Sequence, residues 1–259
     1  MNRIERAFTQ GKAFIPFITG GDPDLETTEK LLRALHEAGA DAIEIGIPFS
    51  DPIAEGPVIE AADERALRAG CTVDKLFELV ARVRAGIRVP LLFMTYYNPI
   101  FAYGVERFTA KCATCGIDGL IVPDLPFEER EELFGPCAAR ELTLISLVAP
   151  TSEERIANIA KNSSGFLYCV SSLGVTGERR EIGSSARRIV EQARKASPIP
   201  CAVGFGVSTA AQAKEISSFA DGVIIGSAIV RIIAEHGRES IQPVYQFARD
   251  IKQAIMQGV

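Results

Sequence analysis

Short, almost continuously apolar segments alternate along the chain with longer amphipathic segments. Eight of the apolar runs have the length of strands, and their lack of alternation is typical of parallel strands covered on both faces. They are AFIPFIT (13–19), DAIEIG (41–46), PLLFMTY (90–96), DGLIVP (118–123), LTLISLV (142–148), GFLYCV (165–170), IPCAVGFG (199–206) and DGVIIG (221–226). The pattern therefore predicts eight buried parallel strands.

The segments between these runs have the spacing of amphipathic helices. In residues 24–40 the apolar side chains fall on one face; Asp24 is placed to cap the helix and Gly39 to end it. Residues 127–141 and 184–197 show the same pattern. Helices thus follow the predicted strands in alternation.

Eight strand–helix units predict an α/β protein, a (β/α)8 or TIM barrel, forming one domain over residues 1–259. An open, doubly wound sheet is the alternative, since the number of strands alone does not close a barrel. The longest separations follow the second and sixth strands, so we expect extra helical material after the second strand and a mobile loop after the sixth. Because barrel enzymes carry their active sites at the carboxyl ends of the strands, these connections are where function is sought first.

Composition narrows the class of protein. Of 259 residues, 47% are hydrophobic and 24% charged, an ordinary globular mixture, and a net charge of −5 without a basic run argues against nucleic acid as a partner. We see neither a membrane-spanning run nor the apolar core of a secretion signal. Six cysteines are too sparse for a disulfide scaffold, and Cys112 and Cys115 read as buried helical thiols rather than a metal or redox pair. We therefore expect a cytoplasmic protein with reduced thiols and no metal.

Carboxylates near the end of the second strand are the candidate acids and bases. Glu44 interrupts an otherwise apolar strand, where burial would raise its pKa toward neutrality and suit it to give and take a proton. Glu55, in the proline-rich loop that follows, is a second acid at the same end, and Asp51 is a third that fits a turn or cap equally well. A structural Glu44 paired with a buried Arg or Lys is the alternative.

Glycines at the ends of later strands are candidates for phosphate binding. Gly206 follows the seventh strand, Gly226 and Ser227 precede a helix after the eighth, and the loop 171–179 holds further glycines. Backbone N–H groups at such glycines and at a helix N-terminus bind anions, although each glycine alone is also compatible with a simple turn. The aromatic residues Phe17, Tyr96, Tyr168 and Phe205 would line an apolar pocket beside the phosphate, or else pack in the barrel core.

Five segments together resemble the tryptophan synthase alpha chain family from about residue 4 to the end of the chain. They are FIPFITGGDP (14–23), EIGIPFSDPIAEGPVI (44–59), SSLGVTG (171–177), VGFGVS (203–208) and IIGSAIV (224–230). The resemblance implies a lyase of tryptophan biosynthesis that cleaves indole-3-glycerol phosphate to indole and glyceraldehyde 3-phosphate by a retro-aldol reaction. It also implies that this chain uses no cofactor.

The resemblance assigns roles by position. Glu44 matches the principal acid and base, which protonates indole C3, and Glu55 matches the acid that receives the indole N–H. Phe17, Tyr96 and Tyr168 match the pocket; Gly177, Gly206, Gly226 and Ser227 match the phosphate site; and Thr176 matches a lid residue that contacts the aspartate equivalent to Asp51. The implied partner is a beta chain that holds pyridoxal phosphate, in an αββα assembly, approached through the loop of Pro48, Asp51 and Pro52.

One position departs from the family pattern. The second acid is ordinarily Asp, and here it is Glu55, whose extra methylene displaces the carboxylate by roughly 1.5 Å, enough to cost about 100-fold if nothing compensates. This departure motivates one alternative to an active alpha chain, a weakly active or silent chain that serves as allosteric partner of a beta chain. A second alternative, another phosphate-binding barrel such as a sugar-phosphate isomerase or epimerase, is based on analogy of fold alone.

Overall fold

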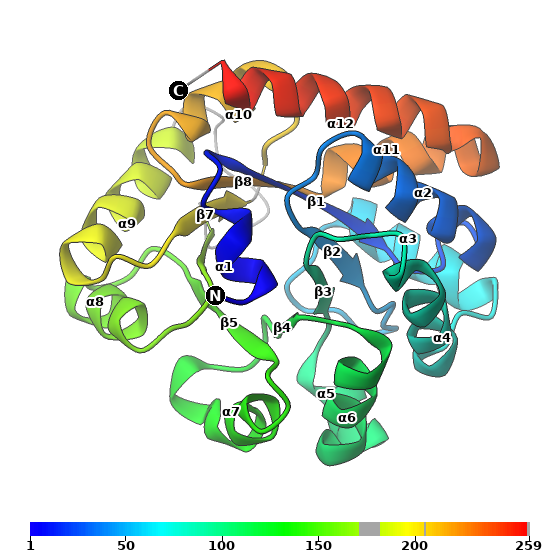
Figure 1. Ribbon diagram of the computed structural model, residues 1–259, viewed down its shortest axis with the longest axis horizontal. Coiled ribbons are helices and arrows are strands. Elements are labelled where there is room, and N and C mark those ends of the chain that lie inside the picture. Colours follow the sequence, from blue (N-terminus) through cyan, green and yellow to red (C-terminus); the bar gives the residue numbers. More distant parts are fainter. Residues whose placement is uncertain (171–181, 205, 258–259) are drawn as a thin grey trace.

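The computed structural model describes residues 1–170, 182–204 and 206–257. Eight parallel strands pair in the order β1 to β8, and β8 closes back onto β1, so the sheet is a barrel (Figure 1). The strands are β1 (Ala13–Thr19), β2 (Ile43–Gly46), β3 (Leu91–Met94), β4 (Gly119–Ile121), β5 (Thr143–Val148), β6 (Leu167–Val170), β7 (Cys201–Gly204) and β8 (Gly222–Ile225). Each lies within its predicted run, and the closed barrel is confirmed over the open sheet.

Helices surround the barrel (Figure 1). They are α1 (Arg3–Ala7), α2 (Leu25–Glu37), α3 (Pro57–Arg68), α4 (Val73–Arg84), α5 (Tyr97–Tyr103), α6 (Val105–Cys115), η1 (Phe127–Glu129), α7 (Glu131–Ala138), α8 (Glu153–Lys161), α9 (Ile182–Ala196), α10 (Ala210–Ser217), α11 (Ser227–His236), η2 (Gly237–Ser240) and α12 (Ile241–Met256). Two helices, α3 and α4, separate β2 from β3, which confirms the extra helical material expected there. The predicted mobility of the loop after β6 concerns residues outside the described ranges.

Local signals act as the sequence predicts. The Asp24 carboxylate accepts the Thr27 N–H at 2.8 Å and so caps α2, and Gly39 adopts a φ of +96° just beyond the end of that helix. Pro57 is the first residue of α3, where its missing N–H costs no hydrogen bond.

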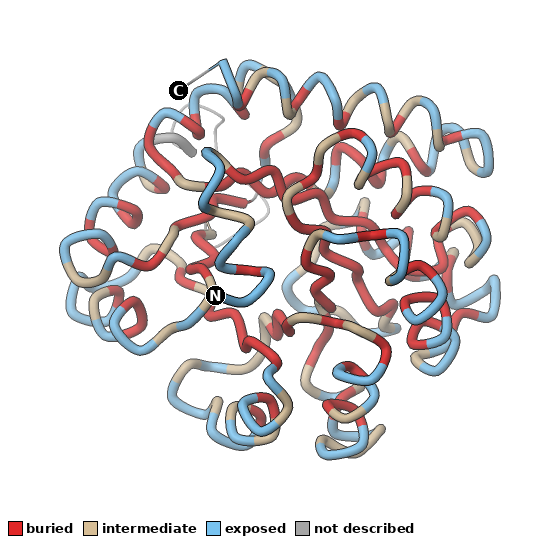
Figure 2. Tube along the Cα trace, in the orientation of Figure 1, coloured by how far each residue is buried: buried red, intermediate tan, exposed pale blue. Residues whose placement is uncertain are grey.

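Most of the strand backbone is buried (Figure 2), and two apolar cores account for the burial of the strands on both faces. One lies between the strands and the surrounding helices, and the other fills the barrel. Inside the barrel, Ile4 from α1 plugs the amino-terminal end, and the rings of Phe8 and Phe166 lie 5.4 Å apart beside it. The amino-terminal end is therefore filled by α1, which leaves the carboxyl end for chemistry.

All six cysteines are buried as free thiols, and Cys112 and Cys115 belong to the outer core. This confirms the interpretation of the CxxC pair as packing residues. Of the helices described, none is long and apolar enough to cross a membrane.

Candidate functional site

Glu44 lies in the middle of β2 with its side chain turned into the barrel. It has the same strand parity as Ala42, which belongs to the interior core, and it is paired in register with Phe17 of β1 and Leu92 of β3. The residue is 0% exposed, and neither carboxylate oxygen has a hydrogen-bond partner. Burial alone raises the pKa of Glu44 to about 8, so it is mostly protonated at neutral pH. The alternative of a structural ion pair is wrong.

Buried polar atoms without partners gather around Glu44. In the described ranges six such side-chain atoms occur, and four of them belong to Thr19 at the end of β1, to Glu44, and to Glu55 in the loop after β2. A native protein rarely leaves buried polar groups unpaired away from a functional site. The cluster at the carboxyl ends of β1 and β2 thus indicates a place where a polar ligand completes the hydrogen bonds.

Glu55 shares its surroundings with a second carboxyl that the sequence analysis missed. Asp63, on α3, is 4% exposed and lies against Glu55, and the Tyr96 hydroxyl is a further neighbour of Glu55. Burial raises the pKa of both carboxyls, and for Asp63 the charge of Glu55 adds to the effect. A signal was available, because Asp63 falls on the apolar face of α3 with Ile59, Ala62 and Ala66.

Aromatic side chains surround the cluster. Phe17 and Tyr168 are 6% and 5% exposed, and Tyr168 lies near enough to Glu44 that the carboxylate charge helps to raise the phenol pKa, after burial. The Tyr96 hydroxyl accepts the Ala54 N–H at 2.9 Å, which ties the loop after β2 to the end of β3. These three predicted pocket residues are thus brought to one end of the barrel, with Ile59 of α3 and Val230 of α11 packed beside Phe17.

Glycines make room for these rings. A Cβ at Gly46 would lie 2.7 Å from the Phe17 ring, and one at Gly204 would lie 2.6 Å from the Tyr168 hydroxyl. A side chain at either position would therefore have to displace an aromatic wall of the pocket. This role of Gly204 differs from the phosphate role predicted for its loop.

Three members of the predicted anion site, Gly206, Gly226 and Ser227, lie within the described residues. Gly226 precedes α11 without a side-chain cap, Ser227 is exposed at the first position of the helix, and Gly206 has a φ of +76°. An uncapped helix N-terminus presents N–H groups and a positive dipole end to an anion. Thr176, Gly177 and Phe205, the other members predicted for this region, lie outside the described residues.

The loop expected to meet a partner is unevenly exposed. Pro48 is buried, Pro52 is half-buried, and Asp51 is exposed and accepts a hydrogen bond from the Ser50 hydroxyl at 2.5 Å. Ile53 is 80% exposed, although it is a large apolar residue. Pro48 is thus the buried base of the loop, and Ile53 is its exposed apolar tip. The sequence analysis did not single out Ile53.

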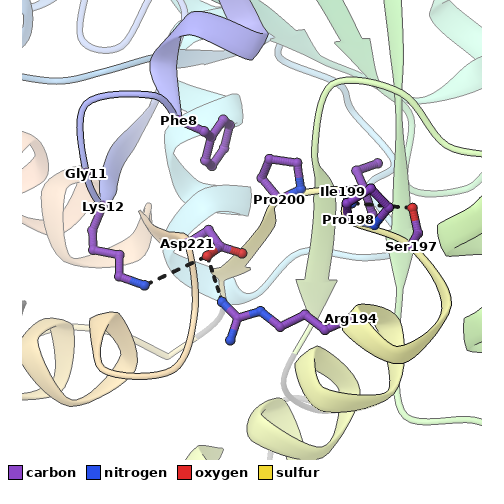
Figure 3. A pocket seen from close by; sticks show the side chains of 9 residues that line it. All are labelled: Phe8, Gly11, Lys12, Arg194, Ser197, Pro198, Ile199, Pro200 and Asp221. Carbon is purple, nitrogen blue, oxygen red and sulfur yellow. Dashed lines mark hydrogen bonds and ion pairs between the residues drawn. The ribbon is translucent and has the colours of Figure 1, made fainter.

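A cavity of about 590 Å³ lies at the opposite end of the barrel (Figure 3). Its cations, Lys12 and Arg194, are both paired with Asp221, at 3.8 Å and 2.6 Å, and Asp221 also accepts the Cys201 N–H. The cavity lies at the amino-terminal ends of β1, β7 and β8, whereas the site around Glu44 lies at the opposite end of the barrel. The charged side chains that line the cavity pair with one another and hold these strand ends together. No group of three or more metal-binding side chains occurs among the described residues.

Comparison with known proteins agrees with this arrangement. The family model described as tryptophan synthase alpha chain matches residues 5–256. The alpha chain of Thermoanaerobacter sp. is 44% identical, with 98% of this chain and all of that protein covered, and that of Shouchella clausii is 47% identical, with 96% of each covered.

The chain belongs to the tryptophan synthase alpha chain family. It is a lyase that cleaves indole-3-glycerol phosphate to indole and glyceraldehyde 3-phosphate in tryptophan biosynthesis.

Solved structures of the family have the same fold. Tryptophan synthase subunit alpha from Legionella pneumophila superposes with a TM-score of 0.90 at 36% identity over 99% of each chain. A chain of the tryptophan synthase complex from Pyrococcus furiosus gives a TM-score of 0.85 at 36% identity, covering 94% of this chain and all of that one. The (β/α)8 barrel predicted from the eight strand–helix units is therefore the fold of this family member.

Proposed function

We propose that Glu44 is the acid and base of indole-3-glycerol phosphate cleavage and that Glu55 binds the indole N–H. The observation that carries the proposal is the fully buried, unpartnered Glu44 carboxyl inside the mouth of the barrel. A carboxyl that is protonated at neutral pH yet close to ionising is suited to both directions of proton transfer.

The reaction follows from these positions. Protonated Glu44 gives its proton to indole C3, which breaks the aromaticity of the ring and leaves positive charge on the ring nitrogen. The Glu55 carboxylate, facing the N–H, stabilises that charge. Glu44, now a carboxylate, takes the proton of the side-chain hydroxyl next to the ring. The bond from C3 to the side chain then breaks, its electrons restore the aromatic indole, and the aldehyde of glyceraldehyde 3-phosphate forms.

Binding is divided between an apolar wall and an anion site. Phe17, Tyr96 and Tyr168 enclose the indole ring, and the N-terminus of α11 with Gly206, Gly226 and Ser227 holds the phosphate. The uncapped helix supports the phosphate role, and the burial of the three rings supports the indole role. Thr176, Gly177 and Phe205 complete the phosphate and lid regions in this proposal.

The partner in this proposal is a tryptophan synthase beta chain, in an αββα heterotetramer in the cytoplasm, with pyridoxal phosphate held by the beta chain alone. The loop tip supports it: Ile53 and, after the next strand, Phe101 are 80% and 67% exposed. Large apolar side chains exposed on the segments that follow β2 and β3 are typical of an interface. Asp51 and Pro52 flank this tip, and Thr176 would contact Asp51 when the lid closes.

The activity assay is a steady-state measurement of indole release from indole-3-glycerol phosphate, with and without beta chain. The same compound without its phosphate group is the matched substrate, and we expect its kcat/KM to fall by about 100-fold or more because the anion contacts are lost. Equal kcat/KM values for the two compounds would remove the proposed phosphate site.

Two variants test the second acid and the interface. Glu55→Asp restores the residue usual in the family; a loss of activity would mean that the loop is built around Glu, and a large gain would favour the weakly active alternative. Ile53→Asp is expected to weaken beta-chain binding by about tenfold or more. Met256→Asp, at a large apolar residue that is 64% exposed at the end of α12, is expected to leave it unchanged. Equal binding by both variants would exclude Ile53 from the interface.

A further inference from the structure

Asp63 is a buried acid whose position the fold fixes tightly. It lies on α3 and accepts the Phe49 N–H at 3.5 Å, and the Thr19 hydroxyl lies beside it. Two residues further along α3, Arg65 binds the buried Asp22 carboxylate through two hydrogen bonds of 2.8 Å each. Since Asp22 follows β1, the helix that carries Asp63 is anchored to the rim of the barrel.

Within the described part of the chain, the surroundings of the Glu55–Asp63 pair do not offset two negative charges. The described groups that act on the pair are the carboxyl of Glu60, the phenol of Tyr96, the thiol of Cys71, the hydroxyl of Thr19 and the Phe49 N–H. None of these groups is a cation. Two carboxylates in contact in such a place cannot both ionise at neutral pH, so the pair keeps one proton.

The pair shares its proton between the two side chains, so one oxygen of Asp63 faces one oxygen of Glu55. The Glu55 oxygen Oε2 is buried without a hydrogen-bond partner. This arrangement orients a carboxylate that carries one more rotatable bond than the Asp usual in the family.

We propose that Asp63 is a positioning residue, which holds the Glu55 carboxylate in place through a shared proton so that Glu55 faces the indole N–H. The inference rests on the proposed role of Glu55 and explains how the longer acid is accommodated. The extra methylene shifts the carboxylate toward α3, and the proton shared with Asp63 fixes it there. When the shared proton is lost at high pH, like charges repel and Glu55 is displaced.

Steady-state kinetics of five variants beside the wild type test the positioning role. Asp63→Ala removes the donor and is expected to lower kcat/KM by about tenfold to 100-fold. Asp63→Asn keeps a donor of the same shape and loses less. Glu64→Gln, an exposed neighbour on the same helix, is the control and stays at the wild-type value. In a Glu55→Gln background Asp63→Ala should cost almost nothing more, because the group it positions is gone. Losses that multiply in the double variant would overturn the proposal.

The shared proton is measured without turnover. In Glu44→Gln protein carrying ¹³C at the Glu and Asp side-chain carboxyl carbons, NMR should detect one carboxyl titrating near pH 8, where the raised pKa of Asp63 lies, and Asp63→Asn should abolish it. Retention of that titration in Asp63→Asn, or ordinary acidic titration of both carboxyls, would overturn the shared proton. Because this readout needs no indole release, its failure is distinguishable from failure of the proposed catalytic roles.

Discussion

Replacing Glu44 with glutamine should abolish most of the activity and at the same time stabilise the folded protein. Glutamine has nearly the same shape as protonated glutamate, so it fills the same place in the barrel without a void. It has no proton to exchange with indole C3, and loss of a general acid and base costs about 10² to 10⁴ in kcat.

The stability change can be worked from the burial of Glu44. A pKa raised from its ordinary value of 4.5 to about 8 corresponds to roughly 5 kcal/mol against the ionised form in the folded state. Below about pH 4 the carboxyl is protonated in both states and nothing is lost. As the pH rises, the unfolded chain releases the proton while the folded chain keeps it, so the wild type loses stability until the pH passes about 8. The glutamine variant escapes this loss.

Urea unfolding followed by circular dichroism, from about pH 4 to about pH 8, measures the effect. We expect the free energies of unfolding of wild type and Glu44→Gln to be similar at the acid end, and the variant to be more stable by about 3 kcal/mol at neutral pH. Glu37→Gln, an exposed acid at the end of α2, is the control and should show no such trend. Indole release is measured on the same preparations.

Two results would refute this reasoning. A glutamine variant that keeps more than about a tenth of the wild-type kcat would remove Glu44 from the proton transfers. A stability difference that does not change with pH would mean that Glu44 is not buried as a neutral acid in the folded protein.

Three further predictions concern the pH profile, the pocket and the frame of the site. The kcat/KM of the wild type should fall as the pH rises through about 8, because the protonated form of Glu44 gives the proton; a flat profile to pH 9 would contradict this. Gly204→Ala should lower kcat/KM by about tenfold, since its Cβ would lie 2.6 Å from the Tyr168 hydroxyl, whereas Gly135→Ala, whose Cβ meets nothing within 4 Å, should not; equal values would exclude a tight pocket. Asp22→Ala should reduce the free energy of unfolding by about 2 kcal/mol in urea, less than for a fully buried pair because Arg65 is a third exposed, and an unchanged midpoint would show that the pair contributes nothing.

The positions of the strands and their alternation with helices could be predicted from the sequence, because a strand buried on both faces is a continuous run of apolar residues. Each predicted run contains a strand, and the ends of α2 and the start of α3 follow from Asp24, Gly39 and Pro57. These features depend on contacts within a few residues, which local propensity and capping control. Glu44 stood out for the same reason, as one charge in an apolar run.

The direction of Glu44 and the existence of its neighbours were decided only by the tertiary structure. A strand that is apolar on both faces does not reveal which face turns inward, and closure of the barrel determines that Glu44 points to the interior rather than to a helix. Asp63 was overlooked because its partner Glu55 lies in a loop and its backbone support comes from Phe49, a contact made only when α3 docks on the barrel. The sequence thus determined which groups the protein has for acid–base chemistry, and the three-dimensional packing decided which of them are desolvated and face one another, because pKa values depend on neighbours in space rather than along the chain.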